Sequence, residues 1–287
     1  MIELDGLAPV SLEIMSKIQL KFLKPWLLLA LTYFFISCVS APIINKARAN
    51  LAKIRATVVI DAGHGGEDPG AVSPSGLKEK DLCLDIALRI KRLLNIVMPE
   101  IKVVMTRESD TYVSLEKRIQ IADRAQGDLF ISVHINSSDN KEAKGFEVYS
   151  LDTASDRHAE RLANRENKNL GENQKLVKFI LADLRANAHR NESDQLARHI
   201  AHSLQSQITK KVGVDAAKHR GNNQAIFHVL FVKMPAVLAE LLFLSNPPEE
   251  QLLKTQAVRE SCARGIVAGV GKYLDQRMVR AQNARSR

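Results

Sequence analysis

Residues 58–71, VVIDAGHGGEDPGA, join a β-branched segment to a glycine-rich loop. The β-branched part, 57–61 (TVVID), is bounded by glycine and predicts a buried strand. Beyond the loop, apolar side chains recur through 81–97 at the spacing of an amphipathic helix, at Leu82, Ile86, Ile90, Leu93, Leu94 and Val97. A strand, a glycine-rich loop and a helix in this order predict the first unit of an α/β fold.

The same alternation of strands and helices continues along the chain. Further strands are expected at 102–106, 129–134, 145–149, 226–230 and 236–240, and helices at 114–125 and 249–273. We therefore expect one α/β domain at 56–275, with a single central mixed sheet, helices on both of its faces, and a helical insertion at 153–190. The last residues, 276–287, form a basic tail with four Arg, for which disorder is expected.

Composition limits the classes of protein to which the chain can belong. Of its 287 residues, 45% are hydrophobic and 25% charged, which suffices to bury a core and excludes a disordered or collagen-like chain. Three Cys exclude a disulfide framework and a clustered Cys zinc module. The net charge, 41 bases minus 32 acids, is +9 and favours a polyanionic partner. Aromatic residues make up only 5% and no nucleic-acid-binding motif occurs, so nucleic acid is not expected.

The N-terminal segment has the layout of a secretory signal peptide. Lysines precede the uncharged run WLLLALTYFFISCV at 26–39, and small residues follow it, so cleavage after Ala41 is expected. The run is shorter than the roughly 20 apolar residues of a membrane span. An uncleaved anchor and a lipoprotein cleaved at Cys38 are the alternatives, and a start at Met15 would give a cleaner signal. We expect export to the periplasm or beyond, transient membrane contact through this segment, and a basic lead-in at 42–55.

Chemically active side chains follow the ends of the expected strands. In open α/β sheets ligands collect at the carboxyl ends of the strands, and the residues found there are Asp61, His64, Arg107, His134, Asn136 and Glu240. Catalytic zinc sites use three protein ligands and leave one position for water. Nitrogen and oxygen ligands without a thiolate, such as His64, Glu79 and His134, fit that kind of site.

Five segments carry a resemblance to a known family. They are 58–71, GLKEKDLCLDIA at 76–87, MTRESD at 105–110, FISVHINS at 130–137 and MPAVLAELLFLSN at 234–246. In this order they resemble the zinc-dependent N-acetylmuramoyl-L-alanine amidases of the amidase-3 type, which cut bacterial peptidoglycan. The resemblance covers roughly 56–275, nearly the whole chain after the signal peptide.

The resemblance implies roles for individual residues. His64, Glu79 and His134 match the positions that bind one zinc ion in this family, and Glu240 matches its catalytic glutamate. From the residues alone, Glu79 could instead be an acid that offsets a helix dipole. Glu240 directly follows an apolar run. A carboxylate at such a place has no inexpensive structural role, which favours a functional one.

The remaining polar candidates and the departures from the family pattern concern the surroundings of the metal. Asp61 is expected to orient a histidine or the glycine loop. Asn136 and Arg107 are expected either to contact substrate or to brace loops. Leu241-Leu242 stand where the family has small residues, and Ala122-Asp123 where it often has Ala-Asn. These departures bear on substrate fit more than on metal binding.

The insertion at 153–190 corresponds to a segment that, in related periplasmic amidases, occludes the zinc until a partner protein removes it. Leu162, Glu166 and Leu170 fall on one helical line. We therefore expect Glu166 to act as an autoinhibitory ligand at the open zinc position. The alternative is a solvated helix in which Glu166 pairs with a nearby Arg or Lys.

The function expected from this pattern is that of an exported zinc hydrolase. It would cleave the amide between N-acetylmuramic acid and L-alanine in peptidoglycan, with a periplasmic activator as a further partner. An exported zinc peptidase acting on stem peptides, and a non-catalytic wall-binding protein of the same fold, are the alternatives. The sequence leaves open whether the activity serves daughter-cell separation or recycling.

Overall fold

The computed structural model describes residues 55–152, 155–168, 172–213 and 218–286, with the side chains of 172–188, 222 and 285 excepted. The expected signal peptide with its alternative start at Met15, and all of the basic lead-in except Arg55, lie outside these residues. So does Leu170 of the expected helical line. Among the described helices, none is long and apolar enough to cross a membrane.

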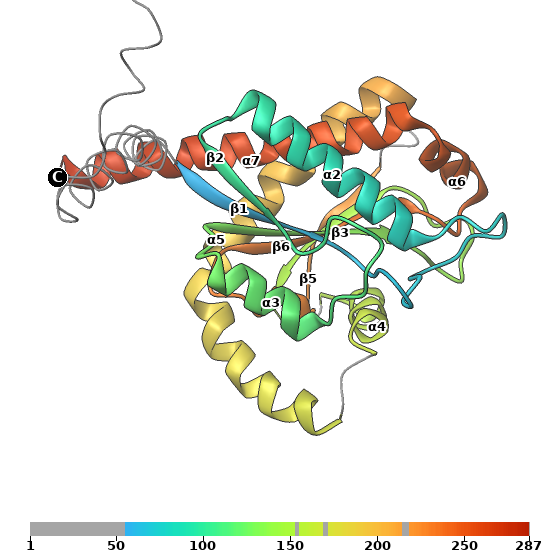
Figure 1. Cartoon of the computed structure of the whole chain (residues 1–287), viewed down its shortest axis with the longest axis horizontal. Coiled ribbons are helices and arrows are strands. Elements are labelled where there is room, and N and C mark those ends of the chain that lie inside the picture. The colour runs from blue at the N-terminus through green and yellow to red at the C-terminus, as the bar shows by residue number, and fades with distance from the viewer. Residues whose placement is uncertain (1–54, 153–154, 169–171, 214–217, 287) are drawn as a thin grey trace, which may run out of the picture. The chain divides into compact units, whose positions relative to one another are not determined.

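A six-stranded mixed sheet forms the centre of the domain (Figure 1). Its strand order is β2-β1-β3-β6-β4-β5, and neighbours run parallel except for the antiparallel pair of β4 and β6. The strands are β1 (Ala56–Ala62), β2 (Ile101–Met105), β3 (Leu129–Asn136), β4 (Phe146–Leu151), β5 (His219–Ala225) and β6 (Ala236–Phe243).

Helices cover both faces of this sheet, as the sequence predicted. The helices are α2 (Glu79–Val97), α3 (Leu115–Arg124), α4 (Arg157–Glu166), α5 (Glu172–Val212), the 3-10 helix η3 (His228–Leu230), α6 (Pro247–Lys254) and α7 (Gln256–Arg285). Buried side chains of α2, α5 and α7 share one apolar cluster, whereas those of α3, α4 and η3 belong to a second. Figure 1 shows α2 and α7 on one side of the strands and α3 and α4 on the other.

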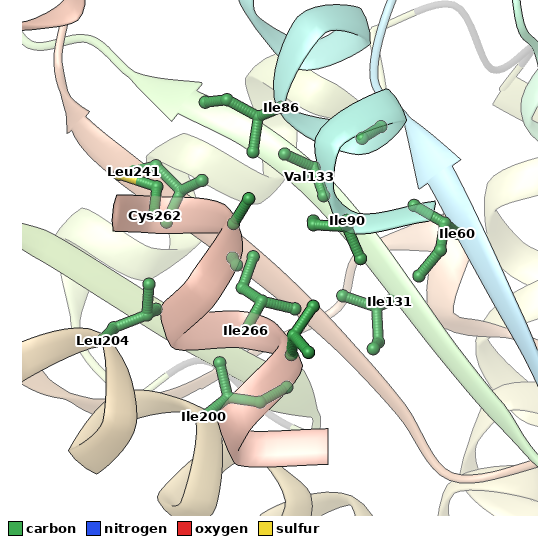
Figure 2. Packing of buried hydrophobic residues seen from close by; sticks show 14 of the residues in the cluster. Ile60, Ile86, Ile90, Ile131, Val133, Ile200, Leu204, Leu241, Cys262 and Ile266 are labelled. Atoms are coloured by element: carbon green, nitrogen blue, oxygen red, sulfur yellow. The ribbon is translucent and has the colours of Figure 1, made fainter. Parts of the chain in front are cut away.

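The two clusters explain why the central strands have continuous apolar sequences. Along β1, Val58 and Ile60 belong to the first cluster, whereas Val59 between them belongs to the second. Figure 2 shows the first cluster, in which Ile60 and Ile131 lie near Ile90 and Ile266 of the covering helices. Alternate side chains of a strand point to opposite faces, and both faces here are buried, so both sets are apolar.

The strand predicted at 226–230 is wrong. The chain instead pairs β5 with β4 and then forms η3. The sequence of β5, HRGNNQA, is polar because β5 is an edge strand of the sheet, so it carries no strand pattern. The apolar run that suggested a strand is apolar because Phe227, Val229 and Leu230 are buried in the second cluster.

The C-terminal end of the chain also differs from expectation. The single helix expected at 249–273 is two helices, α6 and α7, with Thr255 between them as the N-cap of α7. Pro247 and Pro248 begin α6 instead of preceding it, since proline is compatible with a first helical turn. The disorder expected for 276–287 is wrong for 276–285, because α7 continues to Arg285, with Arg277 and Arg280 contacting Asp128 and Gln195.

Close approach of α5 and α7 requires glycine on α7. A Cβ added to Gly269 would lie 2.5 Å from Cα and 2.8 Å from N of Ile200, which are backbone atoms that cannot move independently of α5. We expect Gly269→Ala to lower the free energy of unfolding by about 1–3 kcal/mol, because the two helices must separate. Chemical denaturation measures this change.

Gly271 supplies the matched control. Its added Cβ would meet only the Met98 side chain, at 3.6 Å, which is an ordinary contact. Gly271→Ala should be neutral or stabilise by up to about 1 kcal/mol, because alanine is the better helix former. Equal effects of the two substitutions would contradict the proposed importance of the close helix contact.

Candidate functional site

The loop between β1 and α2 is folded around two side chains of the site. Glu79, the first residue of α2, accepts a hydrogen bond through Oε2 from the backbone N–H of Ala71 at 2.8 Å. A Cβ on Gly70 would lie 2.7 Å from both Glu79 Oε2 and His64 Cδ2. A Cβ on Gly63 would lie 2.5 Å from the ring of His134. The glycines therefore let the backbone close tightly around these groups.

His64, Glu79 and His134 lie together at the carboxyl edge of the sheet. Oε1 of Glu79 is 3.1 Å from Nε2 of His64 and 3.1 Å from Nδ1 of His134. The two imidazole rings are edge to face, with centroids 4.9 Å apart. The fold thus brings three residues from the glycine loop, α2 and β3 to one point.

Glu166, the last residue of α4, reaches the same point. Its Oε2 lies 3.3 Å from His64 Nε2 and 3.5 Å from His134 Nδ1. These three side chains offer ligand atoms that all lie within 4.8 Å of one another, a spacing that could hold a metal ion. Four side chains therefore direct nitrogen or carboxylate oxygen atoms toward one centre.

The charges of this cluster fit a bound cation. Nδ1 of His64 is 2.9 Å from Oδ2 of Asp68, while its buried Nε2 has no hydrogen-bond partner among the described residues. Burial disfavours charge on the ring, but Glu79, Asp68 and Glu166 together raise the pKa of His64 to about 11. So many carboxylates in a buried site require positive charge. A divalent cation with nitrogen and oxygen ligands, such as zinc, would supply it.

Glu240 lies next to this cluster on β6. It is aligned with His134 in the β3–β6 register and is fully buried. Neither of its carboxylate oxygens has a hydrogen-bond partner in the described part of the chain. Burial, and then the charges of Glu79 and Glu166, raise the pKa of Glu240 well above its ordinary value. A carboxyl group without structural contacts remains able to accept and release a proton.

Asp61 lies in a buried polar network beside the cluster. It accepts hydrogen bonds from the hydroxyls of Thr106 and Ser132, each at 2.6 Å, and from Arg118 at 2.7 Å. Burial alone would raise the pKa of Asp61, but Arg118 and the two hydroxyls hold it below its ordinary value. Arg118 also donates to the carbonyl of His64 at 2.7 Å, so this network fixes the backbone of the glycine loop.

Arg107 and Asn136 make bracing contacts. Arg107 donates to backbone carbonyls of β1, the glycine loop, α2 and its own loop, at Ala62, Gly63, Lys80 and Ser109. Asn136 donates through Nδ2 to Glu147 at 2.6 Å and accepts from the backbone of Ser137 at 2.8 Å. Of the two roles considered from the sequence, these contacts serve the bracing of loops.

Sequence reasoning missed three residues of this region. Arg118 could have been found, because it lies on the same face of α3 as Leu115 and Ala122, where a buried helix normally has an apolar residue. Glu147 interrupts the apolar strand β4 and is aligned with Glu240 across the antiparallel pair. Arg165 carries no such signal, since other arginines and glutamates stand close to it along α4.

Comparisons with known proteins point to one family. The family Amidase_3, N-acetylmuramoyl-L-alanine amidase, matches residues 58–272. The amidase AmiA of Escherichia coli (strain K12) is 35% identical over 240 residues, or 80% of this chain and 80% of AmiA. AmiC of Neisseria meningitidis is 32% identical over 231 residues, or 77% of this chain and 53% of AmiC. The chain therefore spans about half the length of that second relative.

A solved structure agrees with this assignment. The crystal structure of N-acetylmuramoyl-L-alanine amidase from Clostridium difficile 630 matches with a TM-score of 0.58 and 30% identity, covering 77% of this chain and 97% of that one. The fold and the buried cluster define an α/β enzyme with a site suited to a metal. The chain belongs to the N-acetylmuramoyl-L-alanine amidase family. The expected enzyme class and the mixed-sheet fold are thereby confirmed.

Removal of the Asp61 charge tests the buried network. Asp61→Asn leaves the Arg118 guanidinium buried without its charged partner, so we expect the free energy of unfolding to fall by about 3–5 kcal/mol. Asp275→Asn is the control, because Asp275 is 69% exposed and pairs with Arg55 at the surface. That change should stay below about 1 kcal/mol. A loss at Asp61 no larger than the control's would show that the network does not stabilise the loop.

Proposed function

We propose that the chain is an exported zinc enzyme that hydrolyses the amide between the lactyl group of N-acetylmuramic acid and L-alanine in peptidoglycan. The observation that carries this proposal is the convergence of His64, Glu79 and His134 beside the unpartnered carboxyl of Glu240. His64, Glu79 and His134 would hold one zinc ion. When bound, zinc would lower the pKa of a water molecule from about 15.7 toward about 7 and polarise the scissile carbonyl.

Glu240 moves the proton in this proposal. Amide hydrolysis needs a base for the attacking water and an acid for the departing amine. The carboxyl oxygens of Glu240 are free to accept the proton from water and then to donate it to the nitrogen of L-alanine. Asp68 holds the His64 ring through Nδ1, which leaves Nε2 directed at the centre of the cluster.

The arrangement of α4 supports a closed, autoinhibited state. Glu166 occupies the position at which water or substrate would otherwise approach His64 and His134. Arg165 orients this carboxylate by donating from Nε to Glu166 Oε1 at 2.9 Å and from Nη1 to the carbonyl of Ser137 at 2.8 Å. The pairing of Glu166 with an Arg, expected in the solvated-helix alternative, is present, but the Glu166 side chain is only 8% exposed, which favours the inhibitory role over a solvated one.

Removal of α4 would open the site. The helix buries only Ala159, Leu162 and Ala163 in the second apolar cluster. Its exposed side carries two bases, Arg157 and Arg161, beside two acids, Asp156 and Glu160, and offers a charged surface to a periplasmic activator. Such an activator would displace Glu166 from the cluster and permit substrate to enter.

Export and cell-wall localisation are part of the same proposal. They are supported by the signal-peptide pattern of 1–41 and the net charge of +9, which suits a wall polymer rich in carboxylates. An enzyme that is inactive until α4 is displaced suits localised cutting of the wall, as in daughter-cell separation. Peptidoglycan is therefore the proposed substrate and polymer partner.

Product analysis tests the reaction. Purified protein with zinc should release intact stem peptides from peptidoglycan, detected by mass spectrometry, and a chelator should abolish their release. Release of terminal D-alanine instead would identify a carboxypeptidase. Binding to peptidoglycan without any cleavage, also after removal of the Glu166 carboxylate, would identify a non-catalytic wall-binding protein.

Substitutions of His64 and Glu240 should separate metal binding from proton transfer. We expect His64→Ala to lose both zinc and activity, whereas Glu240→Gln keeps zinc and loses about 10²–10⁴-fold in rate. Zinc content is measured by inductively coupled plasma mass spectrometry. His199→Ala is the control, because His199 contacts Gln276 on the surface between α5 and α7. A fully active His64→Ala protein would reject the zinc site.

Substitution of Glu166 should activate the enzyme. Glu166→Ala removes the carboxylate that closes the cluster, so we expect basal cleavage of peptidoglycan to rise at least severalfold. Glu160→Ala on the exposed side of the same helix should leave the basal rate unchanged. Turbidity of a peptidoglycan suspension follows both rates. An unaltered rate for Glu166→Ala would rule out the autoinhibitory role.

A further inference from the structure

Tyr112 presents an exposed aromatic ring at the candidate site. Its side chain is 42% exposed, and it lines the same pocket as His64, His134 and Glu166. Among the Phe and Tyr residues whose side chains the structure describes, the others are all buried. An exposed aromatic side chain at the edge of a polar site is a common feature of ligand recognition.

The loop that carries Tyr112 is held in place by charged side chains. Arg107 donates to the carbonyl of Ser109 at 3.1 Å, and Arg118 donates to that of Val113 at 2.8 Å. Between these points, Asp110 accepts from Lys80 Nζ at 2.6 Å and from the backbone of Gly66 at 2.8 Å. The loop is thus fixed on both sides of Tyr112, so its ring can contact a ligand at little entropic cost.

The backbone of Tyr112 packs directly on the glycine loop. Gly66 has a φ of +58°, and a Cβ added there would lie 2.6 Å from N and 3.0 Å from Cβ of Tyr112. Gly66 is two residues from His64 in the sequence. Tyr112 is therefore placed at a defined position relative to the proposed metal ligands.

The chemistry of the proposed substrate places a sugar close to the scissile bond. The lactyl carbonyl is joined to C3 of the muramic acid ring through one carbon and one ether oxygen. When the carbonyl lies at the cluster, the sugar must therefore contact the wall of the pocket within a few ångströms. In the proposed activation α4 is displaced, and its side of the pocket moves away with it. The side formed by Tyr112 remains in place.

We propose that Tyr112 is a specificity-determining residue, whose ring supports the apolar face of the muramic acid ring. This inference rests on the proposed function and deepens it, because it assigns the sugar side of the substrate to the 107–114 loop. The contact is made equally in the bound substrate and in the transition state. It therefore acts on KM and leaves kcat unchanged.

The test compares two substrates in the full chain with zinc, carrying Glu166→Ala so that the site is open. One is a disaccharide tetrapeptide from peptidoglycan, and the other is the same peptide with D-lactate in place of the sugars. Tyr112→Ala should raise KM for the first about threefold to tenfold at constant kcat. It should leave kcat/KM for the second unchanged, and Tyr112→Phe and Tyr112→Trp should restore the KM.

Ile96→Ala is the control for loss of an exposed apolar side chain, since Ile96 is 64% exposed at the far end of α2. Equal losses of Tyr112→Ala on both substrates, or no loss on either, would overturn the proposal. If the protein with Tyr112 intact cleaves neither substrate, the proposed function fails. Binding of the disaccharide tetrapeptide, measured by calorimetry, then decides the role of Tyr112. The proposal requires that the Tyr112→Ala protein bind it more weakly than the protein with Tyr112 intact.

Discussion

The carboxylate of Glu79 holds the site together. It is fully buried, yet it contacts both imidazoles through Oε1 and accepts backbone N–H groups from Ala71 and Ile135 at 2.8 and 3.1 Å. Burial would raise the pKa of Glu79, but the two histidines hold it well below its ordinary value. One charged group thus joins the glycine loop, the start of α2 and the end of β3.

The predictable part of the fold is the part that is buried on both sides. The strands at 57–61, 129–134 and 236–240 could be predicted because two layers of helices require continuous apolar sequences there. The edge strand β5 could not, since a polar segment such as HRGNNQA pairs through its backbone and leaves no side-chain pattern. The strand predicted at 226–230 is misplaced because the apolar run there resembles a strand. Its apolar residues pack in η3 and its flanks.

The candidate site could be anticipated where strand ends and motifs marked it, as at His64, His134 and Glu240. The contacts that support the site were harder to predict from the sequence. Arg118 and Glu147 act by bonding to groups far away in the sequence, at 57 and 11 residues from Asp61 and Asn136, respectively. The insertion was expected to bring Glu166 inward from its helical line. The contribution of Arg165 emerges only in three dimensions, because it depends on the carbonyl of Ser137.

The proposed closed state has an energetic consequence for activation. Moving a two-state equilibrium from about 1:99 to 99:1 requires about 5.5 kcal/mol of differential binding. The apolar contacts of α4 are limited to Leu162 and two alanines, and full burial of one leucine contributes about 1.5–3 kcal/mol. Most of the remaining free energy that keeps α4 docked must therefore come from polar contacts, chiefly those of Arg165 and Glu166 with the site. A partner displaces α4 only to the extent that it binds the displaced helix more tightly than the docked one, so it must also contact residues of α4 that are covered in the closed state.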